Sequence, residues 1–346
     1  MKIPLRLAAL FVCAPFASAL TIQLDYSFDA ANGNFFGLNP AAKAAVDAAA
    51  LDLGNAIAPS LGAVPTDVFT GTNGASTATF NWDLTFTNPS TGAGESLSTF
   101  SFPADRVTIY VGMRNILGTT LGQGGPGGAG ISAGLGGPPG DNPGAVAAAS
   151  AASDAAMKRG GGPVIGVLSS SVGGIGYSVS YGALLGNLWF DSDSNNDGAT
   201  DDLITLASYW HYDHTTAVSA GKNDFYSVAL HEILHSIGFG TASTWDLLRS
   251  GLTWNGAAVT ALNGGPVSLF DNAHIAEGFM SQRFVGGGAQ EAVMDPTLTV
   301  GTRKFLTTMD AAFLRDLGYQ TVPEPCALVL GVLGGVWMAV RRRARA

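Results

Sequence analysis

Two histidines four residues apart, His231 and His235, constrain the fold of this chain more than any other feature. On an α-helix with 3.6 residues per turn, positions i and i+4 lie above one another on the same face. Both imidazoles can then reach one zinc ion at about 2.0–2.1 Å. The apolar residues around them, from Val228 to Ile237, indicate a helix buried beneath a cleft.

The residue after the first histidine carries the chemistry. Glu232 follows His231 directly, so its carboxylate is expected beside a metal rather than on it. There it can take a proton from a zinc-activated water that attacks a carbonyl group. A catalytic zinc site also needs a third protein ligand and an open position for water. The other histidines are His211, His214 and His274, and the residues alone leave the third ligand open.

The pair His211 and His214 lies shortly before this helix. In a strand, positions 211 and 214 point to opposite faces, so we do not expect both to bind one ion. Exposed or hydrogen-bonded histidines are the favoured interpretation, and a second metal site or an oxyanion donor is the alternative.

The N-terminus carries an export signal. Residues 1–19 combine a basic start, a short apolar run and the small residues Ala-Ser-Ala, which is the pattern of a secretory signal peptide. The two cysteines, Cys13 and Cys326, both lie in the end segments of the chain. We therefore expect a domain without disulfides between them.

The C-terminal tail has its own signal. Pro323-Glu324-Pro325 precedes an apolar run over residues 326–340 and a cluster of arginines. The run is short for a membrane span of about 20 residues, but the arginines fix an inside end. This order resembles the PEP-CTERM sorting tail of diderm bacteria. The resemblance implies transient inner-membrane anchoring through residues 323–346, removal by an exosortase-type enzyme, and release to the cell surface or extracellular matrix. A plain C-terminal anchor is the alternative.

The net charge of the chain limits which classes of binding partner are expected. Eleven of the 17 basic and 25 of the 26 acidic residues lie within residues 20–322, which gives that segment a formal charge of −14. Such an acidic surface argues against nucleic acid and anionic lipid as partners. The 47 glycines and the low share of charged residues are typical of a loop-rich extracellular domain.

Local patterns predict one domain over residues 20–322, with no internal repeat. Helices are predicted over residues 40–58, 145–157 and 225–237, and strands over residues 78–88, 106–113, 184–190 and 205–212. Asp224 is suited to cap the start of the third helix, and Gly238 to end it. Residues 120–144 are rich in Gly and Pro and predict a long surface loop, with a linker favoured over a substrate-contacting flap.

Residues 191–202 concentrate oxygen ligands of the kind that calcium prefers: Asp191, Asp193, Asn195, Asp197 and Asp201. From Asp193 the spacing Asp-x-Asn-x-Asp-Gly matches the first half of a calcium loop. The twelfth position is Ile204 instead of a bidentate glutamate, so this is no regular EF-hand. A Ca²⁺ ion bracing the segment before the zinc helix and a solvated acidic turn are the two interpretations.

The residues after the zinc helix carry a resemblance. Metzincin proteases extend the motif with a histidine where this chain has Thr241. Downstream come His274-Ile-Ala-Glu, Glu291-Ala-Val-Met-Asp-Pro and a segment over 306–319 that ends in Asp-Leu-Gly-Tyr. Together with residues 231–240 these resemble the leishmanolysin branch of the metzincins, in which an insert precedes the third histidine. The resemblance covers about residues 205–320.

The resemblance implies an α+β fold of metzincin type. It combines a twisted mixed β-sheet and an active-site helix with a small C-terminal subdomain that has a Met-turn and a closing helix. The implied roles are zinc ligation by His231, His235 and His274, general-base catalysis by Glu232, and an apolar floor from Met294. The sequence departs from the family after His274, where an aromatic residue is common, and Asp271 is the alternative ligand.

These patterns predict a secreted or cell-surface zinc metalloendopeptidase that hydrolyses protein or peptide substrates. Zn²⁺ is the expected cofactor, and Ca²⁺ a second one if the acidic loop binds it. Two alternatives remain: a catalytically silent metzincin-fold protein of the surface or matrix, and a calcium-dependent adhesion module. Glu232 favours the enzyme, because a purely structural zinc site needs no base.

Overall fold

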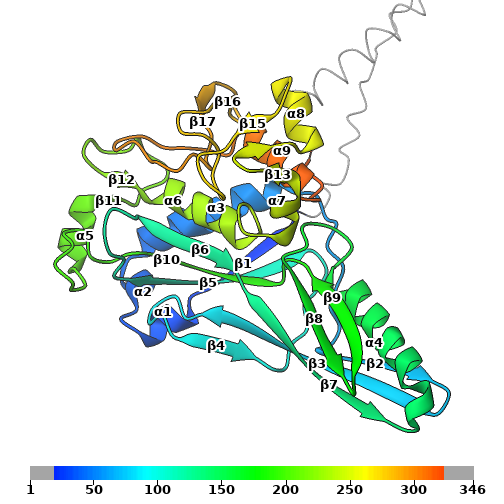
Figure 1. Cartoon of the computed structure of the whole chain (residues 1–346). Coiled ribbons are helices and arrows are strands. Elements are labelled where there is room, and N and C mark those ends of the chain that lie inside the picture. Colours follow the sequence, from blue (N-terminus) through cyan, green and yellow to red (C-terminus); the bar gives the residue numbers. More distant parts are fainter. Residues whose placement is uncertain (1–18, 323–346) are drawn as a thin grey trace, which may run out of the picture.

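The computed structural model describes residues 19–322, which form a mixed α+β fold (Figure 1). The predicted sorting tail, and the predicted signal peptide apart from Ala19, lie outside these residues. Within residues 19–322, no helix is long and apolar enough to cross a membrane.

The helices vary from one to almost five turns. They are α1 Ser27–Ala31, α2 Phe35–Leu38, α3 Pro40–Ala56, α4 Asn142–Met157, α5 Leu203–Tyr209, α6 Phe225–Ser236, α7 Ser243–Leu248, α8 Ala257–Asn263 and α9 Thr308–Asp316, with a 3-10 turn at Pro139–Asp141. The helices predicted over 40–58, 145–157 and 225–237 are confirmed as α3, α4 and α6. The expected closing helix is α9.

The central sheet has the strand order β1-β5-β10-β6. Its strands are β1 Thr21–Asp25, β5 Arg106–Arg114, β10 Leu185–Asp191 and β6 Gly122–Pro126. β1 and β10 run parallel to β5, whereas β6 runs antiparallel to β10 and forms an outer edge. The sheet is therefore mixed, as predicted, and two of its strands match the predicted ranges 106–113 and 184–190.

A second group of strands lies away from α6 (Figure 1). It comprises β2 Val68–Asn73, β3 Ser76–Thr87, β4 Gly94–Leu97 and β7 Gly128–Gly136, and the hairpin of β8 Gly166–Val172 and β9 Ile175–Tyr181. Side chains of β3 are buried at every second position, which confirms the strand predicted over 78–88. Helix α4 packs on this group, where Trp82 Nε1 donates to Ser153 Oγ at 2.6 Å.

The C-terminal third holds short strands and the last helices. The strands are β11 Trp210–His211, β12 Asn223–Asp224, β13 Arg249–Ser250, β14 Thr253–Trp254, β15 Val267–Ser268, β16 Met280–Gln282 and β17 Ala289–Glu291. In Figure 1, β15–β17 and α8 lie on one side of α6, and the central sheet lies on the other. Helix α6 is thus enclosed between the two parts of the fold.

The ends of α6 follow the sequence closely. Asp224 is the N-cap, and its carboxylate accepts a hydrogen bond from Ser227 N at 3.1 Å. Gly238 ends the helix with a φ of +111°, a backbone conformation that favours glycine. Both predicted ends are confirmed. This fixes where His231 and His235 stand along the helix.

The predicted loop over residues 120–144 was wrong: most of it forms β6 and β7. The glycines of β6 serve close packing rather than a turn. A Cβ on Gly124 would lie 2.3 Å from Glu232 O, and one on Gly122 would lie 2.9 Å from Val228 Cγ1. Because glycine has no side chain, the edge strand β6 can pack closely against α6.

The predicted strand over residues 205–212 was also wrong. Helix α5 occupies Leu203–Tyr209, and only Trp210–His211 is extended. Asp202 caps this helix, because its side chain accepts from Thr205 N at 2.7 Å. The local cap outweighs the strand preference of Thr205 and of the aromatic residues in this segment.

Substituting Gly124→Ala should lower the free energy of unfolding by about 1–3 kcal/mol, because the new methyl group meets the backbone of α6. Urea denaturation measures the change. Gly130→Ala in β7 is the matched control, since a Cβ there meets nothing within 4 Å. Equal stability of the two variants would contradict the close packing of β6 on α6.

Candidate metal centre

Three histidines from two segments meet on one side of α6. His231 and His235 stand on α6, and His274 comes from the segment between β15 and β16. His235 Nε2 lies 3.1 Å from His231 Nε2 and 3.2 Å from His274 Nε2. Within residues 19–322, no other group of three or more His, Cys, Asp or Glu side chains brings its ligand atoms within 4.8 Å of one another.

Each of the three imidazoles is oriented by an oxygen on its Nδ1 atom. The acceptors are Val293 O at 2.9 Å from His231, Phe239 O at 2.8 Å from His235, and both Asp271 carboxylate oxygens at 2.9 Å from His274. A carbonyl or carboxylate oxygen only accepts, so each Nδ1 carries the proton. The three Nε2 lone pairs are then directed at one another. Such oxygen partners are typical of metal-binding histidines.

This donor set fits a zinc ion. Two unprotonated Nε2 atoms cannot share a hydrogen bond, whereas tetrahedral ligands at 2.0–2.1 Å from one ion lie about 3.3 Å apart. A bridging proton is disfavoured as well. Burial and the neighbouring histidines hold the pKa of His231 well below its usual value, and burial lowers the pKa of His235 to about 4. At neutral pH both imidazoles are neutral, as a ligand must be.

Glu232 directly follows His231 in α6 and is buried. Burial raises the pKa of its carboxyl group to about 8, and the backbone N–H of Gly124 opposes the rise. A divalent cation nearby favours the carboxylate form. The residue is thus a group that can accept and return a proton near neutral pH.

A cavity of about 900 Å³ opens over the histidines. One wall is the edge strand β6 with the residues just before it, from Thr119 to Gly124. The opposite wall includes Val293 and residues 295–298, and Val228 of α6 also contributes. The cavity therefore lies between the central sheet and the C-terminal segment, with the three histidines in its lining.

Met294 is fully buried in a turn that links the two halves of the site. Its carbonyl oxygen accepts from Ile275 N at 2.9 Å, next to His274. The buried carboxylate of Asp310 in α9 accepts from Val293 N at 3.1 Å and Met294 N at 3.3 Å. Asp310 of α9 thus fixes the turn. The turn itself contacts His231 through Val293 O and the segment of His274 through Met294 O.

The segment that carries His274 passes close to the end of α6. A Cβ on Gly240 would lie 2.5 Å from Ala273 O, so glycine permits this approach. Thr241, which stands where the longer motif has a histidine, donates its hydroxyl to His235 O at 2.7 Å. Asp271 contacts His274 Nδ1 and not the Nε2 cluster, so this geometry favours His274 over the alternative ligand Asp271.

The remaining histidines lie outside the cluster. His211 is buried; its Nε2 donates to Asp213 O at 2.8 Å, and its Nδ1 accepts from Ser219 N at 3.4 Å. His214 lies in the following turn and stacks on Tyr226 with ring centroids 6.5 Å apart. Both act as hydrogen-bonded or packed side chains, in line with the favoured interpretation.

The acidic loop over 191–201 is tightly hydrogen-bonded. Asp193 Oδ1 accepts from Asp197 N at 3.0 Å, and Asp191 Oδ1 accepts from Ile116 N at 3.0 Å. Asn196 accepts from Gly118 N at 2.9 Å. The loop therefore supports residues 116–118, which precede the cavity wall. Calcium binding by this loop stays a prediction.

No family model, curated protein or solved structure matches this chain. The functional assignment therefore depends on the residues and their geometry. Sequence reasoning missed the orienting role of Asp271, for which the Asp-x-x-His spacing is a signal. It also missed the carbonyl groups of Val293 and Phe239, because backbone partners leave no mark on the residue type.

Adding zinc should raise the melting temperature, because a ligand at about 100 times its Kd stabilises the folded state by about 2.7 kcal/mol. The variant His274→Ala should lose this shift, since it removes one of the three nitrogens. The matched control is His214→Ala, which lies outside the cluster and should keep it. Differential scanning calorimetry measures the melting temperature with and without zinc. A zinc-induced rise in His274→Ala as large as in the wild type would count against this centre.

Proposed function

We propose that this protein is a zinc-dependent endopeptidase of the metzincin type, resembling the leishmanolysin branch. The observation that carries the proposal is the convergence of three Nε2 lone pairs, each fixed by an acceptor on Nδ1. Glu232 lies directly beside this cluster in the sequence. A purely structural zinc site has no need of this base.

The residues present supply the remaining steps of hydrolysis. A zinc ion held by His231, His235 and His274 would supply Lewis-acid activation of water and of the scissile carbonyl group. The carboxylate of Glu232 takes the proton from the attacking water. It then passes the proton to the leaving amine, which breaks the C–N bond and regenerates the base.

The edge strand β6 supports a peptide as the substrate. It lines the same cavity as the histidines and is paired on one side only, with β10. An extended peptide can add to such an edge through backbone hydrogen bonds. This binding mode would carry a scissile bond along the strand past the three histidines.

Several further features support the metzincin type. His274 reaches the site after an insert, Met294 is buried in a turn behind Val293, and α9 closes the C-terminal part. Export by the N-terminal signal and transient membrane anchoring by the C-terminal tail are part of the proposal. They place the substrates, proteins or peptides, outside the cytoplasm.

Substituting Glu232→Gln should lower kcat for a casein or peptide substrate by at least about 100-fold, the usual contribution of a general base. Zinc content should stay at the wild-type level, because Glu232 is not among the three ligands. Fluorogenic peptide cleavage and atomic absorption measure the two quantities.

The exposed Glu277→Gln serves as the control and should keep wild-type activity. Wild-type turnover in Glu232→Gln would contradict the mechanism. A wild-type protein that binds zinc but cleaves no peptide would point to the catalytically silent alternative.

A further inference from the structure

We propose that Arg303 and Lys304 are positioning residues for the metal centre. They fix the first turn of α6 against the segment over 291–297, and so set the distance between the two parts that supply the three histidines. The proposal rests on the proposed function insofar as that function requires zinc binding. Arg303 acts from the far end of α6, whereas Lys304 also contributes to the lining of the cavity over the histidines.

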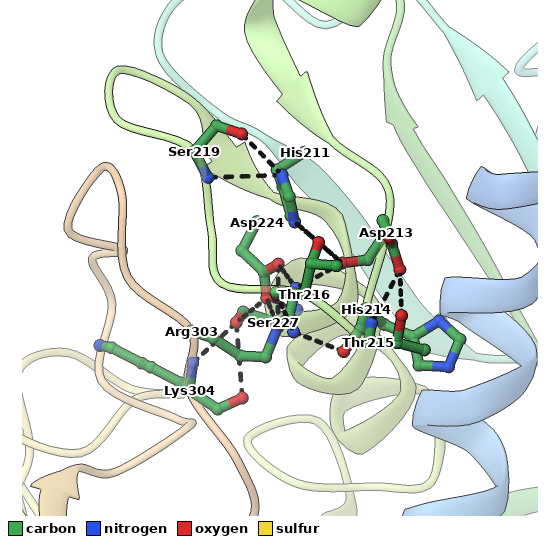
Figure 2. Close-up of polar contacts among 10 residues, drawn as sticks. All are labelled: His211, Asp213, His214, Thr215, Thr216, Ser219, Asp224, Ser227, Arg303 and Lys304. Carbon is green, nitrogen blue, oxygen red and sulfur yellow. Dashed lines mark hydrogen bonds and ion pairs between the residues drawn. The ribbon is translucent and has the colours of Figure 1, made fainter.

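Arg303 forms a buried ion pair with the N-cap of α6. Its Nη2 lies 2.6 Å from Asp224 Oδ1, and its Nε lies 3.0 Å from Oδ2 (Figure 2). Asp224 is fully buried. A buried carboxylate needs such a partner, and the planar guanidinium offers a two-pronged contact that an ammonium group cannot.

The same guanidinium also holds the loop before α6. Its Nη1 donates to His214 O and, at 2.9 Å, to Thr216 O, and its Nη2 donates to Asp213 O at 3.1 Å. In Figure 2 the side chain lies between this loop and Asp224. All five N–H groups of Arg303 are thus directed at named oxygens. The start of α6 has little freedom to shift.

Lys304 extends the contact in the opposite direction. Its backbone N donates to Ser227 Oγ at 2.8 Å, and that hydroxyl donates to Asp224 Oδ2 at 2.6 Å. Its ammonium group, which is also buried, lies 3.0 Å from Glu291 Oε2 and 3.4 Å from Asp295 Oδ1. Arg303 and Lys304 therefore join the first turn of α6 to residues 291–297, which we call the Met294 segment.

The Met294 segment passes this restraint to the histidines. Val293 O accepts from His231 Nδ1, as described above. Asp295 Oδ2 accepts from Gly278 N at 2.5 Å, in the segment that carries His274. A displacement of residues 291–297 relative to α6 would therefore separate the nitrogen atoms of the cluster.

We call the contacts of Arg303 and Lys304 with Asp224 and the Met294 segment the clamp. The test compares two variants of this clamp with a matched control. Arg303→Lys keeps the charge but loses the planar contact. Asp224→Asn keeps a good N-cap but removes the ion pair. The control is Arg159→Lys. The guanidinium of Arg159 is likewise buried on backbone oxygens, those of Gly62, Pro103, Arg106 and Ala183. None of these belongs to α6 or to residues 291–297.

Zinc affinity is measured in the full chain by competition with a chromophoric chelator, at a temperature where circular dichroism shows every variant folded. Both clamp variants should bind zinc at least about tenfold more weakly, as substitutions behind metal ligands do. They should also shift the d–d absorption of bound Co²⁺, which reports ligand geometry. Arg159→Lys should lose stability but change affinity by less than about twofold.

Wild-type affinity and an unchanged cobalt spectrum in both clamp variants would overturn the positioning role and leave the proposed function standing. An equal loss of affinity in Arg159→Lys would also overturn it, because a general loss of stability would then explain the effect. A wild-type protein that binds no zinc would overturn both proposals.

Discussion

The close approach of three unprotonated Nε2 atoms is the interaction around which the C-terminal half is arranged. The Nε2 atoms lie 3.1 and 3.2 Å apart, and their lone pairs repel one another unless a cation lies between them. Hydrogen bonds on the far side of each ring oppose this repulsion. Their acceptors come from the end of α6, from the turn before Met294 and from Asp271. The surrounding fold thus holds the three Nε2 atoms in an arrangement that a bound cation would stabilise.

The local part of this arrangement could be predicted from the sequence. His231 and His235 share a face because they lie one turn apart, and the ends of α6 are set by Asp224 and Gly238. These signals act over a few residues and are readable in any helix. His274 is different: it lies 39 residues from His235 and was assigned through a resemblance rather than by spacing. The structure brings it to the other two.

The wrong predictions have a common cause. Glycine-rich residues 120–144 were interpreted as a loop because glycine is flexible in isolation. Gly122 and Gly124 are instead required by the contact between β6 and α6, which no local pattern reveals. Residues 205–212 were predicted as a strand, but the carboxylate of Asp202 caps a helix over most of them. The clamp around Arg303 went unnoticed because its partners are mostly backbone oxygens.

The support of the Met294 turn by Asp310 has a consequence for the timing of folding. The chain is made from its N-terminus, and a domain folds as a unit once its sequence is complete. Helix α6 can form early, yet the turn that orients His231 awaits the carboxylate of Asp310, which lies 17 residues after Val293. A chain synthesised as far as residue 305 contains all three histidines but lacks the carboxylate that fixes this turn. The spacing of the three Nε2 atoms is therefore complete only once α9 has packed against this turn.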